Sequence, residues 1–274
     1  MRKALVLAAA VVLTSVGTAQ ASAILSDSFS YADNAALAAK WTGAATVVPG
    51  LTFGSLTTSG GAISLNNSDA SSAAVAVTGA QLWTSFLVRQ DTPPESNEWG
   101  DANVVKSYFT DSAGANGKFA YIPLSKKQYQ SSVNYVSLGA TDGGAGSPQL
   151  LLNVGTTYLV IGSVEVNGAL WTTHYDKMWL FDQAAFANFL TAGGTENQLD
   201  ANALSKAITD DGSWGTNTVN AGDLLHLSST VGTATFDEYR SGTSLGDVIV
   251  VPEPASLGLI GAASVALLRR RKRC

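Results

Sequence analysis

Short runs of apolar or alternating residues, separated by turn residues, make up most of this chain. They predict β-strands at residues 74–77, 81–89, 104–110, 118–123, 134–138, 158–166, 177–181 and 224–228. Turn signals such as Gly60-Gly61, Asn116-Gly117 and Asn167-Gly168 separate several of these runs. Helical periodicity is scarce and is confined to 34–41, 183–190 and 198–208, where alanine and leucine cluster. The pattern predicts an all-β domain, and the length of the body suits a single one. The chain has no repeat of fixed period, so a propeller or solenoid is disfavoured.

Two of the predicted strands are apolar in a way that distinguishes them from the rest. The run 82–88 is apolar nearly throughout, and 158–162 is apolar before Val164 and Val166 alternate with Ser163 and Glu165. Continuous apolarity is typical of a strand that is covered on both faces. We therefore expect both strands at the centre of stacked sheets.

The two ends of the chain differ from the body. Arg2 and Lys3 precede an apolar stretch and then Ala21-Ser22-Ala23, which are the regions of a secretory signal peptide with cleavage after Ala23. At the other end, Pro252-Glu253-Pro254 precede 14 apolar or small residues and a basic run that contains Arg269, Arg270 and Arg271. Roughly 20 residues comfortably cross a bilayer, yet the basic run would hold the C-terminus on the cytoplasmic side. A plain C-terminal membrane anchor is the alternative.

The order of parts in this tail resembles the PEP-CTERM signal, which exosortase membrane enzymes of Gram-negative bacteria recognise. The resemblance implies export across the inner membrane, transient anchoring in it, and removal of the tail near Pro252 to Pro254. The protein would then reach the cell surface or the extracellular space. The expected partners are a signal peptidase and an exosortase-like membrane enzyme. The expected division is a signal peptide with a signal helix at 1–23, a β-sandwich domain at 24–250, and a sorting tail with a short transmembrane helix at 251–274.

Three segments of the body resemble a concanavalin A-like (laminin-G-like) jelly roll. They are Leu25-Ser26-Asp27-Ser28-Phe29-Ser30-Tyr31, the strand pair at 158–166 and 177–181, and Phe236-Asp237-Glu238-Tyr239-Arg240-Ser241-Gly242-Thr243. In that fold the early and the late segment lie side by side in one sheet. The resemblance implies packing roles for Phe236 and Tyr239, and a carboxylate partner for Arg240. The stretches 92–99 and 193–222 depart from the pattern and are expected to be loop insertions.

Charge and cysteine content narrow the class of partner. Without the two terminal segments, 20 acidic side chains stand against nine basic ones, a net charge near −11, whereas the whole chain carries −5. This balance excludes nucleic acid as an expected partner, and it would repel an anionic polysaccharide unless a divalent cation bridged the two. The one cysteine, Cys274, lies behind the membrane segment, so no disulfide and no catalytic thiol is expected.

Candidate catalytic groups are sparse. His174 and His226 are the only histidines, and neither lies in a motif that predicts a Ser-His-Asp arrangement. We expect His226 on a strand face and His174 in a loop. Asp237 and Glu238 are consecutive, so in a regular strand they would point to opposite faces and could not form the carboxylate pair of a glycosidase. The sequence therefore predicts no catalytic residue.

Candidate ligand contacts lie in the turns and loops. Calcium prefers six to eight oxygen ligands, and acidic turns occur at 111–117, 142–144 and 210–212. Ordinary turn chemistry explains these stretches equally well, and a calcium site assembled from separate loops stays open. Tryptophans can stack on sugar rings. Of Trp99, Trp171, Trp179 and Trp214, the two in the inserted loops, Trp99 and Trp214, are the better candidates for ligand contact.

The sequence thus predicts an exported, non-catalytic β-sandwich protein with a structural or adhesive role. By resemblance, PEP-CTERM proteins accompany exopolysaccharide production and biofilm, so polysaccharide or cell-surface components are expected partners. The alternative is a lectin-like carbohydrate-binding module, with or without Ca²⁺. A glycan-active enzyme is the third hypothesis, and it would require two carboxylates that converge on the concave sheet.

Overall fold

The computed structural model describes residues 25–54, 56, 58, 60–73, 81–92, 102–110, 112–113, 117–126, 135–139, 149–151, 153–165, 175–210 and 222–249. Its strands are β1 (Leu25–Asp27), β2 (Thr42–Gly43), β3 (Thr46–Pro49), β4 (Gly61–Ala73), β5 (Gln81–Gln90), β6 (Ala102–Thr110), β7 (Gly117–Lys126), β8 (Tyr135–Gly139), β9 (Gln149–Leu151), β10 (Thr157–Glu165), β11 (Tyr175–Phe181), β12 (Ser205–Asp210) and β13 (Leu224–Gly242). Its helices are α1 (Asn34–Ala38), α2 (Gln183–Thr191), α3 (Glu196–Asn202) and α4 (Leu245–Val248). The predicted strand at 74–77 lies outside the described residues.

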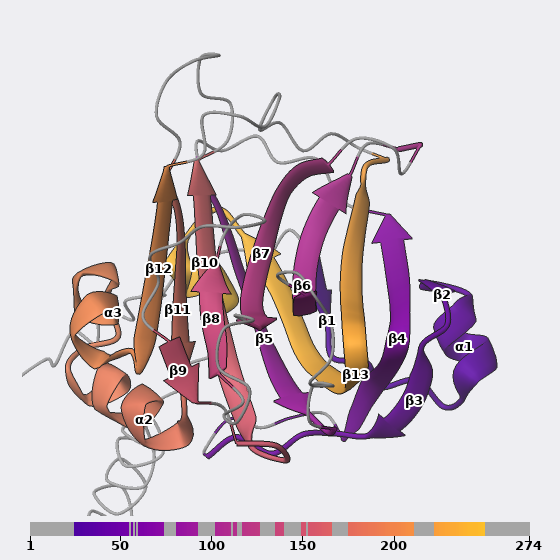
Figure 1. Ribbon diagram of the computed structural model, residues 1–274, viewed down its shortest axis with the longest axis horizontal. Coiled ribbons are helices and arrows are strands. Elements are labelled where there is room, and N and C mark those ends of the chain that lie inside the picture. The colour runs from indigo at the N-terminus through magenta and orange to yellow at the C-terminus, as the bar shows by residue number, and fades with distance from the viewer. Residues whose placement is uncertain are drawn as a thin grey trace, which may run out of the picture.

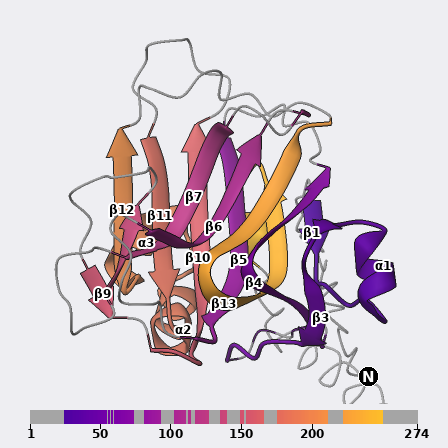
Figure 2. The same ribbon diagram turned by 45° about the vertical axis from the view of Figure 1, so that its right-hand side comes forward.

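The strands form two antiparallel layers that share β13 (Figure 1). We call β4-β13-β6-β7-β8-β9 the front sheet and β12-β11-β10-β5-β13 the back sheet. The first part of β13, Leu224 to Ser229, pairs with β4 and β6, and its last part, Ala234 to Gly242, pairs with β5 while the pairing with β4 continues to Phe236. Between them the register with β4 shifts, and Gly232 adopts a φ of 75°. Figure 2 shows β13 curving from one layer into the other. The predicted all-β jelly-roll sandwich is confirmed.

The central strands of the back sheet bury both of their faces, as the continuous apolar runs predict. On β5, Phe86 and Val88 point into the core between the sheets, while Leu87 points to the outer side. On β10, Val160 points into the core between the sheets and Leu159 points to the outer side. The outer cluster lies beneath α2 and α3 and contains Trp179, Phe181, Phe186, Phe189 and Leu199. Side chains alternate between the two faces of a strand, so strands that pack on the core and also on α2 and α3 need apolar residues on both faces.

The expectation of a loop insertion at 193–222 is wrong for its first part, which contains α3 and β12. The helix predicted at 198–208 is correct only at its start. The helix α3 ends at Asn202, and β12 then pairs with β11 from Ser205 to Asp210. Ala203 follows the helix with an extended backbone, at a ψ of 144°. Pairing with the edge of the back sheet therefore overrides the helix propensity of alanine and leucine in this segment.

The first and last strands of the body lie side by side, as the resemblance to a jelly roll implies. Leu25 pairs with Ser241, and Asp27 pairs with Tyr239. The Asp27 carboxylate accepts hydrogen bonds from the Tyr31 hydroxyl at 2.6 Å and from Trp41 Nε1 at 2.8 Å, and Lys40 Nζ lies 2.9 Å away. This buried carboxylate fixes the first turn of the body against the end of β13.

Candidate functional site

A polar cluster on the outer face of the front sheet joins three strands. Leu225 and Leu227 point into the core between the sheets, so His226 between them points outward. By the same alternation, Tyr108 on β6 and Asp69 on β4 lie on this outer face, because Phe109 and Ala70 are in the core. The register places Tyr108 opposite His226. We call Asp69, Tyr108, Thr110 and His226 the front-sheet cluster.

The Asp69 carboxylate is the centre of the front-sheet cluster. Its Oδ1 lies 2.9 Å from Nδ1 of His226, and its Oδ2 accepts a hydrogen bond of 2.8 Å from the Tyr108 hydroxyl. The rings of Tyr108 and His226 are stacked, with centroids 4.5 Å apart and an interplanar angle of 13°. The Asp69 side chain is 38% exposed, whereas that of His226 is only 11% exposed. The cluster therefore presents a carboxylate to solvent and holds it from behind.

The imidazole of His226 connects this carboxylate to a hydroxyl. Its Nε2 lies 3.0 Å from Oγ1 of Thr110, so the ring bridges Thr110 and Asp69. When Nδ1 donates to Asp69, Nε2 of the neutral ring accepts from the Thr110 hydroxyl. This hydroxyl-imidazole-carboxylate order is the one that activates a nucleophile in hydrolases. Thr110 is only 4% exposed, however, so its hydroxyl is poorly placed to attack a substrate.

Burial, together with the hydrogen bond to Asp69, raises the pKa of Tyr108 well above its ordinary value. The phenol therefore stays protonated at neutral pH and acts as a donor. A carboxylate has about four lone-pair sites, and the described bonds from Tyr108 and His226 use two of them. Asp69 can thus accept hydrogen bonds from the hydroxyl groups of a ligand while its own position is fixed.

The sequence predicts His226 on a strand face, and the structure places it there. It does not predict the partners of His226, because Asp69, Tyr108 and Thr110 come from strands that are distant in sequence. The available signal is the alternation of polar and apolar residues along each strand. That alternation assigns a face to each side chain, but the register between strands decides which side chains meet.

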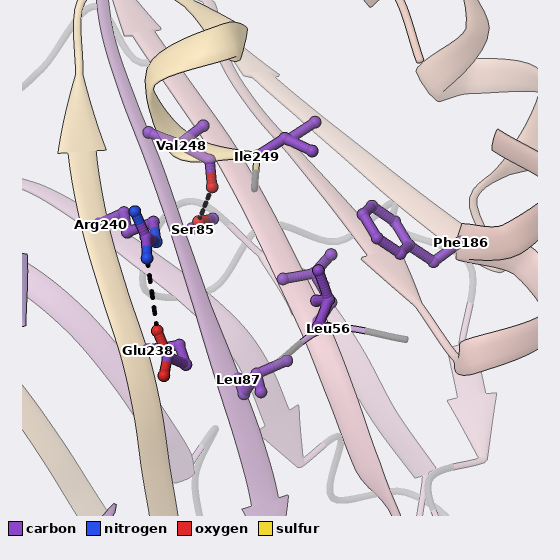
Figure 3. A pocket seen from close by; sticks show the side chains of 9 residues that line it. Leu56, Ser85, Leu87, Phe186, Glu238, Arg240, Val248 and Ile249 are labelled. Atoms are coloured by element: carbon purple, nitrogen blue, oxygen red, sulfur yellow. Dashed lines mark hydrogen bonds and ion pairs between the residues drawn. The ribbon is translucent and has the colours of Figure 1, made fainter. Parts of the chain in front are cut away.

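A small hollow lies on the outer face of the back sheet, beside α4 (Figure 3). Leu56, Leu87, Leu159, Phe186 and Ile249 form its apolar wall, and Glu238 and Arg240 form its polar side. Its cavity volume is about 30 Å³, which is enough for about two water molecules. The hollow is small and mostly apolar, so the front-sheet cluster is the better candidate for a glycan site.

The polar side of this hollow comes from a bulge in β13, which differs from the regular strand considered above. Phe236 and Tyr239 both point into the core, so the two residues between them lie on the outer side. The register with β5 shifts here, and Glu238 adopts a φ of 50°. Asp237 and Glu238 therefore share one side of the sheet, so the expectation that they point to opposite faces is wrong. Arg240 lies 3.5 Å from the Glu238 carboxylate.

Asp237 is fully buried at this bulge. Its two oxygens accept hydrogen bonds from the backbone N–H groups of Leu51, at 2.8 Å, and Glu238, at 2.7 Å. Burial raises the pKa of Asp237 to about 7, against the opposing effect of these two donors. An acid of this strength beside Glu238 would suit general acid catalysis. Asp237 does not line the hollow, and both of its oxygens accept backbone N–H groups, so we assign it a structural role in anchoring Leu51.

Most of the residues singled out in the sequence lie outside the described part of the chain. These are Ala21, Ala23, Trp99, Trp171, His174, Trp214, Pro252, Glu253, Pro254, Arg269, Arg270 and Arg271. Trp179 is described and is not available to a ligand. It is 3% exposed, stacks on Trp83 with centroids 5.9 Å apart, and donates a hydrogen bond of 2.8 Å to Asp200.

Within the described ranges, no group of three or more His, Cys, Asp or Glu residues could hold a metal ion. Of the three acidic turns considered for calcium, the central residues of each lie outside these ranges. Among the helices of the described part, none has the length and apolarity needed to cross a bilayer.

The C-terminal tail marks the chain as an exported protein with a sorting signal. Residues 250–273 match the PEP-CTERM protein-sorting motif. This match confirms the resemblance seen in the sequence, and the motif implies processing by an exosortase. No curated protein matches the sequence of the chain.

Several solved structures are similar to the fold. The alginate lyase Aly36B, as a mutant in complex with alginate trisaccharide, is 14% identical, with a TM-score of 0.41 over 82% of this chain and 99% of that one. The potassium-bound carbohydrate recognition domain of Emp46p is 9% identical, with a TM-score of 0.40 over 81% and 96%. The exoplasmic domain of VIP36, in its Ca²⁺/Man2-bound form, is 10% identical, with a TM-score of 0.38 over 79% and 84%. These likenesses concern the fold alone.

Proposed function

We propose that this exported protein is a non-catalytic, lectin-like component of the cell surface or extracellular matrix. It binds carbohydrate on the outer face of the front sheet, in association with exopolysaccharide or biofilm. The front-sheet cluster is the observation that supports this proposal. Sugars carry adjacent hydroxyl groups that donate to carboxylates, and their C–H faces pack on aromatic rings. Asp69 offers the first kind of contact and the half-buried ring of Tyr108 the second, while His226 holds the carboxylate from behind.

The fixed position of the Asp69 carboxylate favours binding, because the side chain loses little conformational entropy when a ligand binds. Tyr108 and His226 each hold one oxygen of the carboxylate, so the side chain is already ordered before binding. Preorganisation of this kind raises affinity by lowering the entropy cost of association. In the described part of this face, the helices α2 and α3 contribute no cover, because they pack on the back sheet.

One observation favours a second candidate function, a glycan-active enzyme. The bridge of His226 between Thr110 and Asp69 could move a proton along a hydroxyl-imidazole-carboxylate chain. Against it stand the burial of Thr110 and the single carboxylate of the front-sheet cluster, since glycoside cleavage uses a pair. We therefore place binding ahead of catalysis.

The test is a glycan-array assay on the body, residues 24–250, with calcium and with chelator. Asp69→Asn keeps the size of the side chain and removes its charge. A charge-assisted hydrogen bond contributes about 1.5 to 3 kcal/mol, so we expect binding to weaken about tenfold or more. Loss of binding with chelator in the unsubstituted protein would place calcium in the site.

The matched control is Asp200→Asn on α3, which packs on the outer side of the back sheet. Asp200 also accepts a hydrogen bond from an aromatic side chain, Trp179, and it pairs with Lys206 at 2.6 Å. This substitution is expected to leave glycan binding unchanged. Equal binding by the Asp69→Asn and Asp200→Asn variants would refute the site, and no binding to any glycan in either buffer would refute the function. Cleaved glycan after incubation would instead favour the second candidate function, a glycan-active enzyme.

A further inference from the structure

The folded body continues through Ile249, directly before the matched sorting motif and three residues before Pro252. The helix α4 packs directly on β13, where a side chain at Gly242 would overlap that of Asp247. Asp247 Oδ2 accepts the N–H groups of Thr243, at 2.9 Å, and Ser244, at 2.7 Å, and completes a capping box at the start of the helix. The body therefore holds α4 in place from its first turn.

The C-terminal end of α4 is also held by contacts with the body. The hydroxyl of Ser85, on the central strand β5, donates a hydrogen bond of 2.6 Å to the carbonyl of Val248 (Figure 3). Ile249 is only 7% exposed and lines the hollow beside Phe186 and Leu159. Fixed structure thus extends through Ile249.

The length of chain after Ile249 limits how far the sorting motif can lie from the body. Pro252 follows three residues later, and an extended chain spans at most about 3.6 Å per residue, so the Pro-Glu-Pro sequence begins within about 11 Å of Ile249. The apolar segment begins at Ala255, within about 22 Å. The polar layer on one side of a bilayer occupies about 5 to 8 Å. While the tail is in the membrane, α4 must lie close to the membrane surface.

We propose that the folded body restricts access to its own sorting motif. An enzyme that processes the tail must surround Pro252 to Pro254, and this space lies within about 11 Å of α4. The surface formed by α4, with its exposed Gly246, and by the exposed Thr243 before it therefore faces the processing enzyme. Tail removal is slow when α4 is docked and faster when the connection is longer. This inference rests on the sorting motif and does not depend on carbohydrate binding.

The test changes the length of the connection in the full chain, expressed in a bacterium that processes such tails. Insertion of about six Gly and Ser residues after Ile249 adds about 20 Å of reach, and pulse-labelling with mass analysis follows loss of the tail. We expect removal to become several-fold faster. Deletion of Val250 and Val251 is expected to slow it several-fold.

Two controls separate access from folding and export. The same insertion between Gly193 and Gly194, in the turn that ends α2 and where both residues have positive φ, should leave the rate of tail removal unchanged. Ser85→Ala removes the bond to Val248 and should accelerate removal without any change in length. Equal rates with the longer and shorter connections, retention of the tail in all variants, or faster removal after the deletion would each overturn the proposal. Glycan binding by the body is measured separately and tests only the proposed function.

Discussion

The buried carboxyl group of Asp237 predicts a specific dependence of stability on pH. Its two oxygens each accept one backbone N–H, from Leu51 and Glu238, and its pKa is raised by burial from 3.8 to about 7. Asp237→Asn replaces it with a neutral group of nearly the same shape. The amide keeps one acceptor oxygen and loses the other, which leaves one N–H without its partner at a cost of about 1 to 3 kcal/mol.

The sign of the effect follows from the raised pKa. In the unfolded chain the carboxyl group ionises near pH 3.8, whereas in the folded protein it holds its proton to about pH 7. Its stabilising contribution is therefore fully present below about pH 4 and is lost as the pH rises to about 7. The shift of about three pKa units sets an upper limit near 4 kcal/mol. The Asn variant lacks this loss, so it should be less stable than the parent at pH 4.5 and equal or more stable at pH 8.

Urea unfolding of the body, followed by tryptophan fluorescence from pH 4.5 to 8, measures this crossover. The expected change in the difference between parent and variant is about 2 to 4 kcal/mol. Asp200→Asn is the control. The Lys206 ammonium and the Trp179 indole lower the pKa of Asp200, so its contribution is lost only below the ordinary carboxyl range. A constant difference between Asp237→Asn and the parent over this pH range would refute the reasoning.

Two further predictions concern the first turn of the body. Burial opposes ionisation of Asp27, but the hydrogen bonds from Trp41, Tyr31 and Lys40 outweigh it and lower its pKa. Asp27→Asn should therefore reduce the free energy of unfolding at pH 7 by about 2 to 3 kcal/mol. The reduction should become smaller as the pH falls through the carboxyl range. A loss under about 0.5 kcal/mol in urea unfolding at pH 7 would contradict this. In Gly61→Ala the added Cβ would overlap the carbonyl oxygen of Phe29, so thermal unfolding should show a loss of about 2 to 3 kcal/mol. Gly60→Ala has open space but a φ of 90°, and it should cost only about 1 kcal/mol; equal losses in the two variants would contradict the steric argument.

The sequence predicts the architecture well where the pattern of apolar residues within a single strand is sufficient to show how that strand is buried. The apolar runs at 82–88 and 158–162 indicate burial on both faces, and the structure confirms it for β5 and β10. The segment 198–208 shows the limit, because Ala and Leu favour a helix while the edge of β11 is filled by β12. A partner strand outside the segment decides that outcome, and no local pattern contains it.

The candidate site is harder to predict because it is an arrangement between strands. The alternation of polar and apolar residues places Asp69, Tyr108 and His226 on exposed faces, but only the register of β4, β13 and β6 brings them together. The bulge at Asp237 is hidden for a similar reason. A regular strand would separate Asp237 from Glu238, and one extra residue in the ladder places them on the same side.

The strand β13 also has a consequence for the order of events during export. It is the last strand of the body, yet it pairs with β1, β4, β5 and β6 and belongs to both sheets. Contacts between residues so distant in sequence give the fold a high contact order, which slows folding. The front and back sheets cannot be joined before residues 224–242 are available, because β13 is the strand common to both. We therefore expect the complete sandwich to form only after nearly the whole body has been exported.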